Sequence, residues 1–188
     1  LGNPGKKYGR TRRNAGFWWM EQLAHGAKAA FRSEGKFHGR VAKLAGPAEI
    51  WLLMPETYMN ESGRAVAALA SFYRIAPHEI LVAHDELDLP PGAVKLKFGG
   101  GTSGHNGLND IAGRLGSNEF WRLRIGIGHP RDTATEQEVV DYVLHPPRAE
   151  EQPLIEAALE RGLDVWPLLA AGDGQAAMLR LHTKPLES

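Results

Sequence analysis

Apolar residues recur along much of the chain at the three- and four-residue spacing that is typical of an amphipathic helix. Residues 15–25 show it first, directly after Asn14, whose side chain suits a helix N-cap. The buried face of this helix is predicted to carry Phe17, Trp18, Met20 and Leu23. The same spacing predicts a helix between Asn60, as its cap, and Pro77, and further helices over 105–115, 153–171 and 175–181.

Strand patterns separate these helices. Residues 41–44 and 49–54 predict two strands joined by a turn, and residues 80–84 form a nearly continuous apolar run, as in a strand buried on both faces. Residues 93–98 and 120–128 alternate between apolar and polar positions instead. Their alternation predicts solvent-facing sides that carry Lys95 with Lys97 and Arg122 with Arg124.

Strands that alternate with helices predict an α/β fold, with a central, twisted, mixed β-sheet flanked by helices. The chain has 188 residues, the length of one domain, and shows no linker, repeat or low-complexity segment. A single domain over residues 1–188 is therefore expected. A turn begins almost immediately after Leu1, and such a turn usually follows a strand. We therefore expect that a short N-terminal strand is missing from this chain.

The composition, 43% hydrophobic and 23% charged, is typical of a soluble globular protein. The absence of cysteine excludes disulfides and thiolate metal sites. No signal peptide and no apolar run of about 18 residues is present, which favours a cytoplasmic protein. The net charge is zero, yet residues 1–50 contain ten Lys and Arg against three Glu. One end of the chain can therefore attract phosphates although the whole is neutral.

The cations near the start of the chain surround an aromatic side chain. The turn at residues 3–5 is followed by Tyr8 and by five cations, Lys6, Lys7, Arg10, Arg12 and Arg13. Cations beside an exposed aromatic ring suit a partner with phosphates and bases, which indicates nucleic acid. A solvated surface turn ahead of a core helix is the alternative.

Three carboxylates, those of Asp85, Glu86 and Asp88, follow the buried strand predicted at 80–84. Open α/β sheets bind ligands at the carboxyl ends of their strands, so Asp85 is predicted to lie in a crevice. A carboxylate in that place can orient a catalytic histidine, contribute to a Mg²⁺ site or belong to a plain acidic turn. Metal binding is the least favoured of these, because no second cluster of ligands at suitable spacing accompanies Asp85.

Two more polar segments precede predicted helices. Asn60 stands at a helix N-terminus, where free N–H groups favour anions and carbonyl oxygens. Five glycines within residues 99–107 predict a mobile, close-fitting loop that delivers His105 and Asn106 to a cleft. The same glycines satisfy a dinucleotide-binding pattern, which leaves a nucleotide-dependent enzyme as an alternative. The two lysines in the preceding strand disfavour it, because that strand is normally buried.

Taken together, these segments closely resemble bacterial peptidyl-tRNA hydrolases. The resemblance rests on Asn-Pro-Gly-x-x-Tyr (3–8), Thr-Arg-x-Asn-x-Gly-Phe (11–17), Met-Asn-x-Ser-Gly (59–63), His-Asp-Glu-Leu-Asp-Leu-Pro-Pro-Gly (84–92), Gly-His-Asn-Gly-Leu (104–108) and Arg-Leu-Arg-Ile-Gly-Ile-Gly-His-Pro (122–130). It implies a monomeric cytoplasmic enzyme that cleaves the ester between a peptide and the 3′ ribose of tRNA, without a metal or organic cofactor. The implied partner is tRNA or peptidyl-tRNA, with no membrane and no obligate protein partner.

The resemblance also implies roles for individual residues. Asn3 would contact the peptide side, Asp85 would orient the general base, and His105 would lie at the rim of the cleft. Met59 would form a wall of the cleft. The implied tRNA contacts are Tyr8, Tyr58, Asn60 and Asn106, and the implied phosphate contacts are Lys95, Lys97 and Arg124.

Position 13 departs from the family pattern. The family has its general-base histidine there, whereas this chain has Arg13. A guanidinium keeps its proton at physiological pH, so Arg13 cannot take a proton from the attacking water. An ion pair with Arg13 would also make Asp85 a poorer base. A milder departure is Thr102-Ser103, where many relatives have histidine-glycine.

Three hypotheses follow from these observations. The first is a hydrolase whose activity is weak or is rescued by His105 or His84 as a substitute base. The second is a protein that holds tRNA or peptidyl-tRNA without cleaving it. The third is a nucleotide-dependent enzyme that uses the glycine loop.

Overall fold

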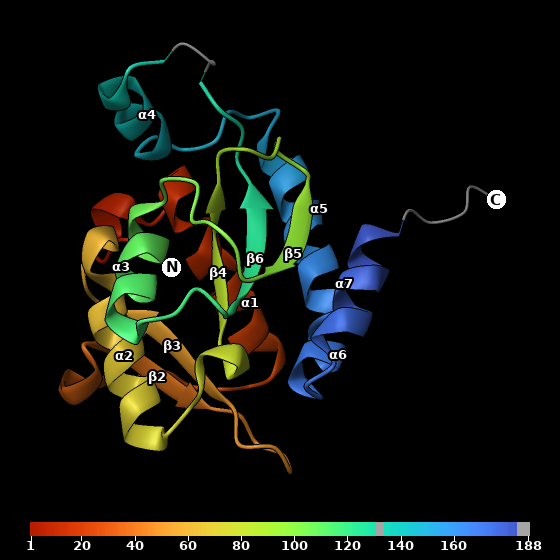
Figure 1. Ribbon diagram of the computed structural model, residues 1–188. Helices are drawn as coiled ribbons and strands as arrows, with labels where there is room; N and C mark the ends of the chain where they lie inside the picture. Colours follow the sequence, from red (N-terminus) through yellow and green to blue (C-terminus); the bar gives the residue numbers. More distant parts are fainter. Residues whose placement is uncertain (131–133, 184–188) are drawn as a thin grey trace.

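The computed structural model describes residues 1–130 and 134–183, and it confirms the α/β class (Figure 1). The strands in these residues form two three-stranded sheets instead of the single central sheet that was expected. The first is antiparallel and contains β1 (Arg32–Glu34), β2 (Gly39–Lys43) and β3 (Trp51–Pro55) in that order. The sequence did not predict β1, because its residues, Arg-Ser-Glu, show no apolar pattern.

The second sheet has the order β4-β6-β5 and contains β4 (Leu81–Glu86), β5 (Val94–Phe98) and β6 (Trp121–Gly126). β4 runs parallel to β6, and β5 runs antiparallel to it. All three strands lie within two residues of their predicted bounds. β4 is buried along nearly its whole length, as its continuous apolar run predicted.

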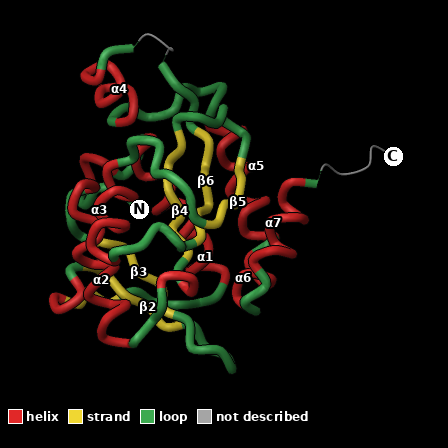
Figure 2. Tube along the Cα trace, viewed as in Figure 1, coloured by secondary structure: helices red, strands yellow, loops and turns green. Residues whose placement is uncertain are grey.

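The helices surround the second sheet. Their bounds are α1 (Ala15–Gly26), α2 (Ser62–Tyr73), α3 (Asn106–Leu115), α4 (Glu136–Val143), α5 (Gln152–Asp164), α6 (Trp166–Ala170) and α7 (Gly174–His182). Figure 2 shows α2 and α3 on one side of the sheet and α5, α6 and α7 on the other. The single helix predicted over 153–171 is wrong: it divides at Val165, and Pro167 lies in the first turn of α6. Among the described residues, no helix is both long and apolar enough to cross a membrane.

Helix α1 packs closely on β4. Trp19 is 1% exposed and belongs to the main core, whereas Trp18 and Met20 are only partly buried, which corrects the predicted face. A Cβ atom added at Gly16 would lie 2.3 Å from the carbonyl oxygen of Ala83, so glycine is required where the helix crosses the strand. This close approach fixes the turn before α1 against the carboxyl end of β4.

The edges of β3 and β4 line a common cavity of about 210 Å³, together with apolar residues of α1 and α2. The backbone nitrogen of Leu1 donates a hydrogen bond to the carbonyl oxygen of Ala83 at 2.7 Å, so the start of the chain lies against β4 beside this cavity. The strand expected ahead of residue 1 stays a prediction.

Candidate active site

Asp85 lies at the carboxyl end of β4, where two charged or polar side chains contact it from other elements. Arg13 Nη1 lies 2.9 Å from Asp85 Oδ2, and His105 Nε2 lies 2.9 Å from Asp85 Oδ1. The side chain of Asp85 is fully buried, and that of Arg13 is 13% exposed. Burial by itself would raise the pKa of Asp85, but the charge of Arg13 and the interactions with His105 outweigh it and lower that pKa below its ordinary value.

His105 caps α3, and both of its ring nitrogens are engaged. The backbone N–H of Leu108 donates to Nδ1 at 3.2 Å. Nδ1 is therefore the acceptor, so Nε2 carries the proton and donates it to Asp85. In this geometry His105 has no free lone pair for a water molecule, which argues against its role as a substitute base.

His84 is the residue before Asp85 and is 1% exposed. Its Nδ1 lies 2.8 Å from the backbone oxygen of Asp85, and its ring packs edge-on against His105 at 4.9 Å between centroids. Among the described residues, its Nε2 is buried without a hydrogen-bond partner. Burial, and next the neighbouring His105, lower the pKa of His84 well below the ordinary value. A neutral imidazole sealed from solvent is not placed to activate water, so this geometry disfavours His84 as well.

Asn3 is held by Asn14 and in turn holds Met59. The backbone N–H of Asn3 donates to Asn14 Oδ1 at 2.8 Å, and Asn14 Nδ2 donates to the Asn3 carbonyl oxygen at 3.0 Å. The side-chain oxygen of Asn3 accepts the N–H of Met59 at 2.8 Å. Asn14 occupies the N-cap position of α1, as predicted, but its side chain makes no capping hydrogen bond because it binds the backbone of Asn3 instead. The sequence did not indicate this contact.

The 3₁₀ turn η4 (Met59–Glu61) and the start of α3 form what we call the rim of the site. Asn60 lies in η4, one turn ahead of α2, so its predicted place as the helix cap is wrong. Asn60 and Asn106 are exposed, Met59 is buried, and Tyr58 is 61% exposed. Hydrogen bonds thus connect Asn3 to Met59 and Asn14, and Asp85 to Arg13 and His105. Asn60 and Asn106 adjoin these contacts as the chain neighbours of Met59 and His105.

The basic face of β5 and β6 is only partly as predicted. Lys95 pairs in register with Arg124, and Lys97 pairs with Arg122, so the four side chains share one face. Lys95 is exposed and Lys97 is partly exposed. Arg124 is partly buried, and its Nε lies 2.8 Å from Glu86 Oε1.

The predicted exposure of Arg122 is wrong. Arg122 is 1% exposed and donates to the backbone oxygens of Gly99, Gly100 and Asn118. Its guanidinium also lies over the ring of Phe120, 4.5 Å from the centroid. Alternation along β6 could not reveal this burial, because the glycine loop folds back over that face of the sheet. Arg122 is therefore the anchor of the loop.

The cations near the chain start also divide into two groups. Arg12 is 4% exposed, and its Nη2 lies 2.9 Å from Glu151 Oε1 while its guanidinium lies over the ring of Tyr142. Arg12 is thus a structural residue that ties the start of the chain to the segment before α5. Lys6, Lys7 and Arg10 are exposed, and Tyr8 is partly buried beside Lys7.

The glycine loop uses the left-handed backbone conformations that glycine permits. Gly99, Gly100 and Gly104 have positive φ, and so does Ser103, at 49°. A side chain in this region costs about 1–2 kcal/mol relative to right-handed backbone, so the serine is a strained feature of the loop. The preceding strand, β5, is an edge strand antiparallel to β6, which does not fit a dinucleotide-binding unit with parallel strands.

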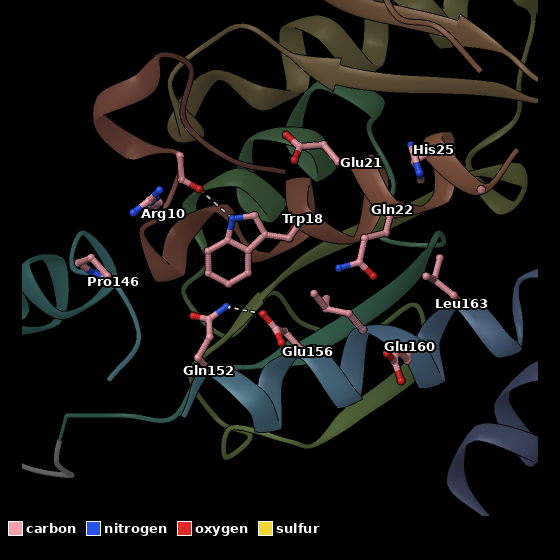
Figure 3. Close-up of a pocket in the computed structure, with 13 residues that line it drawn as sticks. Arg10, Trp18, Glu21, Gln22, His25, Pro146, Gln152, Glu156, Glu160 and Leu163 are labelled. Atoms are coloured by element: carbon pink, nitrogen blue, oxygen red, sulfur yellow. Dashed lines mark hydrogen bonds between the residues drawn. The ribbon is translucent and has the colours of Figure 1, made fainter. Parts of the chain in front are cut away.

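Three surface hollows bear on where a ligand could lie. The largest, about 1090 Å³, lies between α1 and α5, as Figure 3 shows, and its lining includes Trp18 and several glutamates but none of the predicted site residues. The Trp18 indole N–H donates to the Gly9 carbonyl oxygen there, which holds the basic turn against α1. Hollows of about 560 and 280 Å³ border the Asn3-Pro4 turn; the first includes Tyr58 and the second includes Asn14.

The fold and site define an α/β protein with a buried carboxylate centre, an asparagine-bearing rim and a basic sheet face beside it. A family model described as peptidyl-tRNA hydrolase matches residues 1–188. The chain belongs to the peptidyl-tRNA hydrolase family.

Individual relatives agree with this assignment. A peptidyl-tRNA hydrolase of Nitrosospira multiformis is 58% identical over 185 residues, which cover 98% of this chain and 95% of that protein. One of Nitrosomonas europaea is 56% identical over 98% of this chain and 93% of its own length. The crystal structure of an Acinetobacter baumannii peptidyl-tRNA hydrolase, 44% identical, superposes with a TM-score of 0.92 over 97% of this chain and 92% of that one.

Proposed function

We propose that this protein binds peptidyl-tRNA over the hollows that border the Asn3-Pro4 turn, near Asp85, and hydrolyses its ester only slowly, because Arg13 occupies the position of the general base. The carrying observation is the Arg13–Asp85 ion pair, with His105 on the other oxygen of the same carboxylate. Family membership supports the substrate class and the hydrolytic reaction.

The reaction would add one water across the ester. Water attacks the acyl carbon, the bond between that carbon and the 3′ oxygen of the ribose breaks, and one proton passes from the water to the departing ribose oxygen. Asn3 is assigned to the acyl group, and the hydrogen bonds that hold its side chain to Met59 and its backbone to Asn14 support this role, because they keep the residue in one position. Asn60 and Asn106, both exposed on the rim, are assigned to the nucleotide end.

Arg13 affects the proton transfer in this proposal. A guanidinium remains protonated and offers no lone pair. Asp85 is a weak base in this setting, because the same guanidinium lowers its pKa. General-base assistance commonly contributes about 10²–10⁴-fold in rate, so its loss leaves only positioning and polarisation by the asparagines.

The basic face supplies the binding of tRNA phosphates in this proposal. Lys95 and Lys97 extend from β5 with exposed or partly exposed side chains, and Arg124 lies beside them although Glu86 neutralises part of its charge. Tyr8 and Tyr58 are assigned to stacking or packing against the RNA end. The protein is taken to act as a cytoplasmic monomer, as the resemblance implies.

A second candidate function is retention of peptidyl-tRNA without turnover. The observation that favours it is that neither Arg13 nor His105, both within the described residues, offers a free lone pair. Both candidates predict the same binding and differ only in whether the ester is cleaved.

Hydrolysis of N-acetyl-aminoacyl-tRNA by the protein and by Arg13→His tests the proposal. We expect slow cleavage by the unmodified protein and a gain of about 10²-fold or more in Arg13→His, the size of a general base's usual contribution. Arg10→His, a substitution of an exposed cation in the same segment, is the matched control and should give no gain.

The possible outcomes separate the two candidates. If Arg13→His cleaves the ester and the unmodified protein does not, while both bind the N-acetyl-aminoacyl-tRNA, the result would favour retention without turnover. Equal rates in all three forms would show that position 13 is not the site of the general base.

A further inference from the structure

Helix α2 obtains its N-terminal cap from another helix. The residue at its N-cap position, Glu61, makes no capping hydrogen bond with its side chain in the described structure, and the first turn of α2 contains no acidic residue. Instead Asp110, in the middle of α3, accepts the backbone N–H of Gly63 on Oδ2 at 2.7 Å. Figure 1 shows α2 and α3 side by side, as this hydrogen bond requires.

Two glycines let the helices approach at this point. A Cβ atom at Gly63 would lie 2.5 Å from the carbonyl oxygen of Asp110, and one at Gly107 would lie 2.6 Å from Met59 Sδ. The first close approach joins the start of α2 to α3, and the second joins turn η4 to the first turn of α3. Asn60 and Asn106 are the chain neighbours of Met59 and Gly107. Both asparagines therefore lie next to the contact between turn η4 and α3.

The carboxylate of Asp110 connects α3 to α2. Its side chain is 19% exposed and also contacts Arg114 on its own helix, with Nε to Oδ2 at 3.1 Å. Arg114 is 44% exposed, so solvent weakens that ion pair. The bond to Gly63 is different, because a carboxylate at a helix N-terminus satisfies a free N–H and interacts favourably with the helix dipole.

We propose that Asp110 is a positioning residue that holds the turn carrying Asn60 in a fixed place relative to the start of α3, which carries Asn106. The two asparagines can then contact the same 3′ nucleotide end without first being ordered. Asp110 itself touches no substrate. This inference rests on the proposed function, because it assumes that the 3′ end of the RNA lies between turn η4 and the start of α3.

Binding of two RNA hairpins tests it: an acceptor-stem hairpin with a single-stranded 3′ end, and the same hairpin without that end. The dissociation constant of the hairpin without the 3′ end, divided by that of the hairpin with it, measures what the 3′ end contributes to binding. The contribution of phosphates along the stem cancels in this ratio. Circular dichroism melting identifies a temperature at which each variant is folded. A merely structural role would lower the melting temperature and leave the ratio unchanged.

Four variants complete the experiment. Asp110→Ala should reduce the ratio about fivefold, the equilibrium effect of losing a helix cap. Asp110→Asn keeps an oxygen that can accept the Gly63 N–H and should restore most of the ratio. Arg114→Gln, which removes only the surface ion pair, should leave it unchanged. Should Asp110→Ala fail to fold, Asp110→Glu displaces the carboxylate by one methylene and should also lower the ratio.

Two results would overturn the inference in distinguishable ways. A ratio near one in the unmodified protein would contradict the proposed function and this inference together. A ratio above one that persists in folded Asp110→Ala and Asp110→Glu would contradict the role of Asp110 and leave the proposed function intact.

Discussion

The centre around Asp85 and the basic face of β5 differ in how their charges are satisfied. At the centre, the carboxylate is fully buried and contacts both Arg13 and His105. On β5, Lys95 is exposed and Lys97 is partly exposed. The polar groups of the centre are therefore paired with one another, whereas the face keeps its cations available to a polyanion.

This difference separates binding from chemistry. Phosphate binding depends on the number and exposure of cations. A change at position 13 does not alter the cations of β5. Proton transfer depends on one lone pair at one position, which Arg13 does not have. A change at position 13 can therefore lower the proposed rate of hydrolysis and leave the proposed phosphate-binding cations unchanged.

The largest expected effect comes from removing the buried carboxylate. Asp85→Asn leaves the guanidinium of Arg13 without its counter-charge, and breaking a buried ion pair in this way costs about 3–5 kcal/mol of the free energy of unfolding. Urea denaturation would measure it. Asp88→Asn, a substitution of an exposed acid in the following loop, is the control and should change stability little. Equal stability of both variants would show that the centre is not held by its ion pair.

The pH dependence of that loss follows from the lowered pKa of Asp85. A carboxyl group whose pKa is lower in the folded protein than in the unfolded chain stabilises the fold. This stabilisation is fully present at pH values above the pKa of the unfolded chain, which is about 4. The stability difference between the protein and Asp85→Asn should thus be constant from about pH 8 to pH 5 and shrink as the pH falls below about 4. A difference that shrinks near pH 6 would point to a histidine instead.

On the basic face, the double substitution Lys95→Ala with Lys97→Ala should weaken tRNA binding. The slope of log K against log salt should become shallower by about 0.9 for each phosphate that the variant no longer neutralises. Filter binding at several salt concentrations would measure this slope. Lys43→Ala, a substitution of an exposed lysine in the other sheet, should leave it unchanged. An unaltered slope in the double variant would place the RNA elsewhere.

The smallest effect is expected at Asn14. Asn14→Ala removes two hydrogen bonds to the backbone of Asn3, each of which contributes about 1 kcal/mol net. Hydrolysis by the Arg13→His form should fall about tenfold when Asn14→Ala is added, mainly in kcat if Asn3 acts on the reacting ester. Asn118→Ala, at an exposed side chain, is the control. A tenfold loss in that control as well would indicate a general effect on folding.

Much of the fold could be predicted because its signals are local. The apolar run before Asp85 predicted β4 within two residues, and helical spacing predicted α1, α2 and α3. β1 was not predicted, because its three residues are polar and mostly exposed. The eight-residue helix α4 was not predicted either. The break at Val165 was missed since apolar residues continue on both sides of it.

The site was predicted as a set of segments, and most of its internal contacts were not predicted. Motifs in the sequence singled out Asn3, Asp85, His105 and Arg13, and the expected pairing of Arg13 with Asp85 is the geometry observed. Asn14 was interpreted as a cap, and Arg122 as a solvent-facing cation. In both cases the side chain binds the backbone of another segment, which a local sequence pattern does not indicate.

By itself, the sequence determined the α/β class, the buried strand that leads into Asp85 and the identity of the residue at position 13, because periodicity and residue chemistry are properties of the chain. Tertiary structure alone decided that His105 has no free nitrogen, that Arg122 is buried under the glycine loop and that Asp110 caps a different helix. These contacts join residues distant in sequence, and the free energy of burying a charge or satisfying a backbone N–H depends on which atoms packing brings within hydrogen-bond distance.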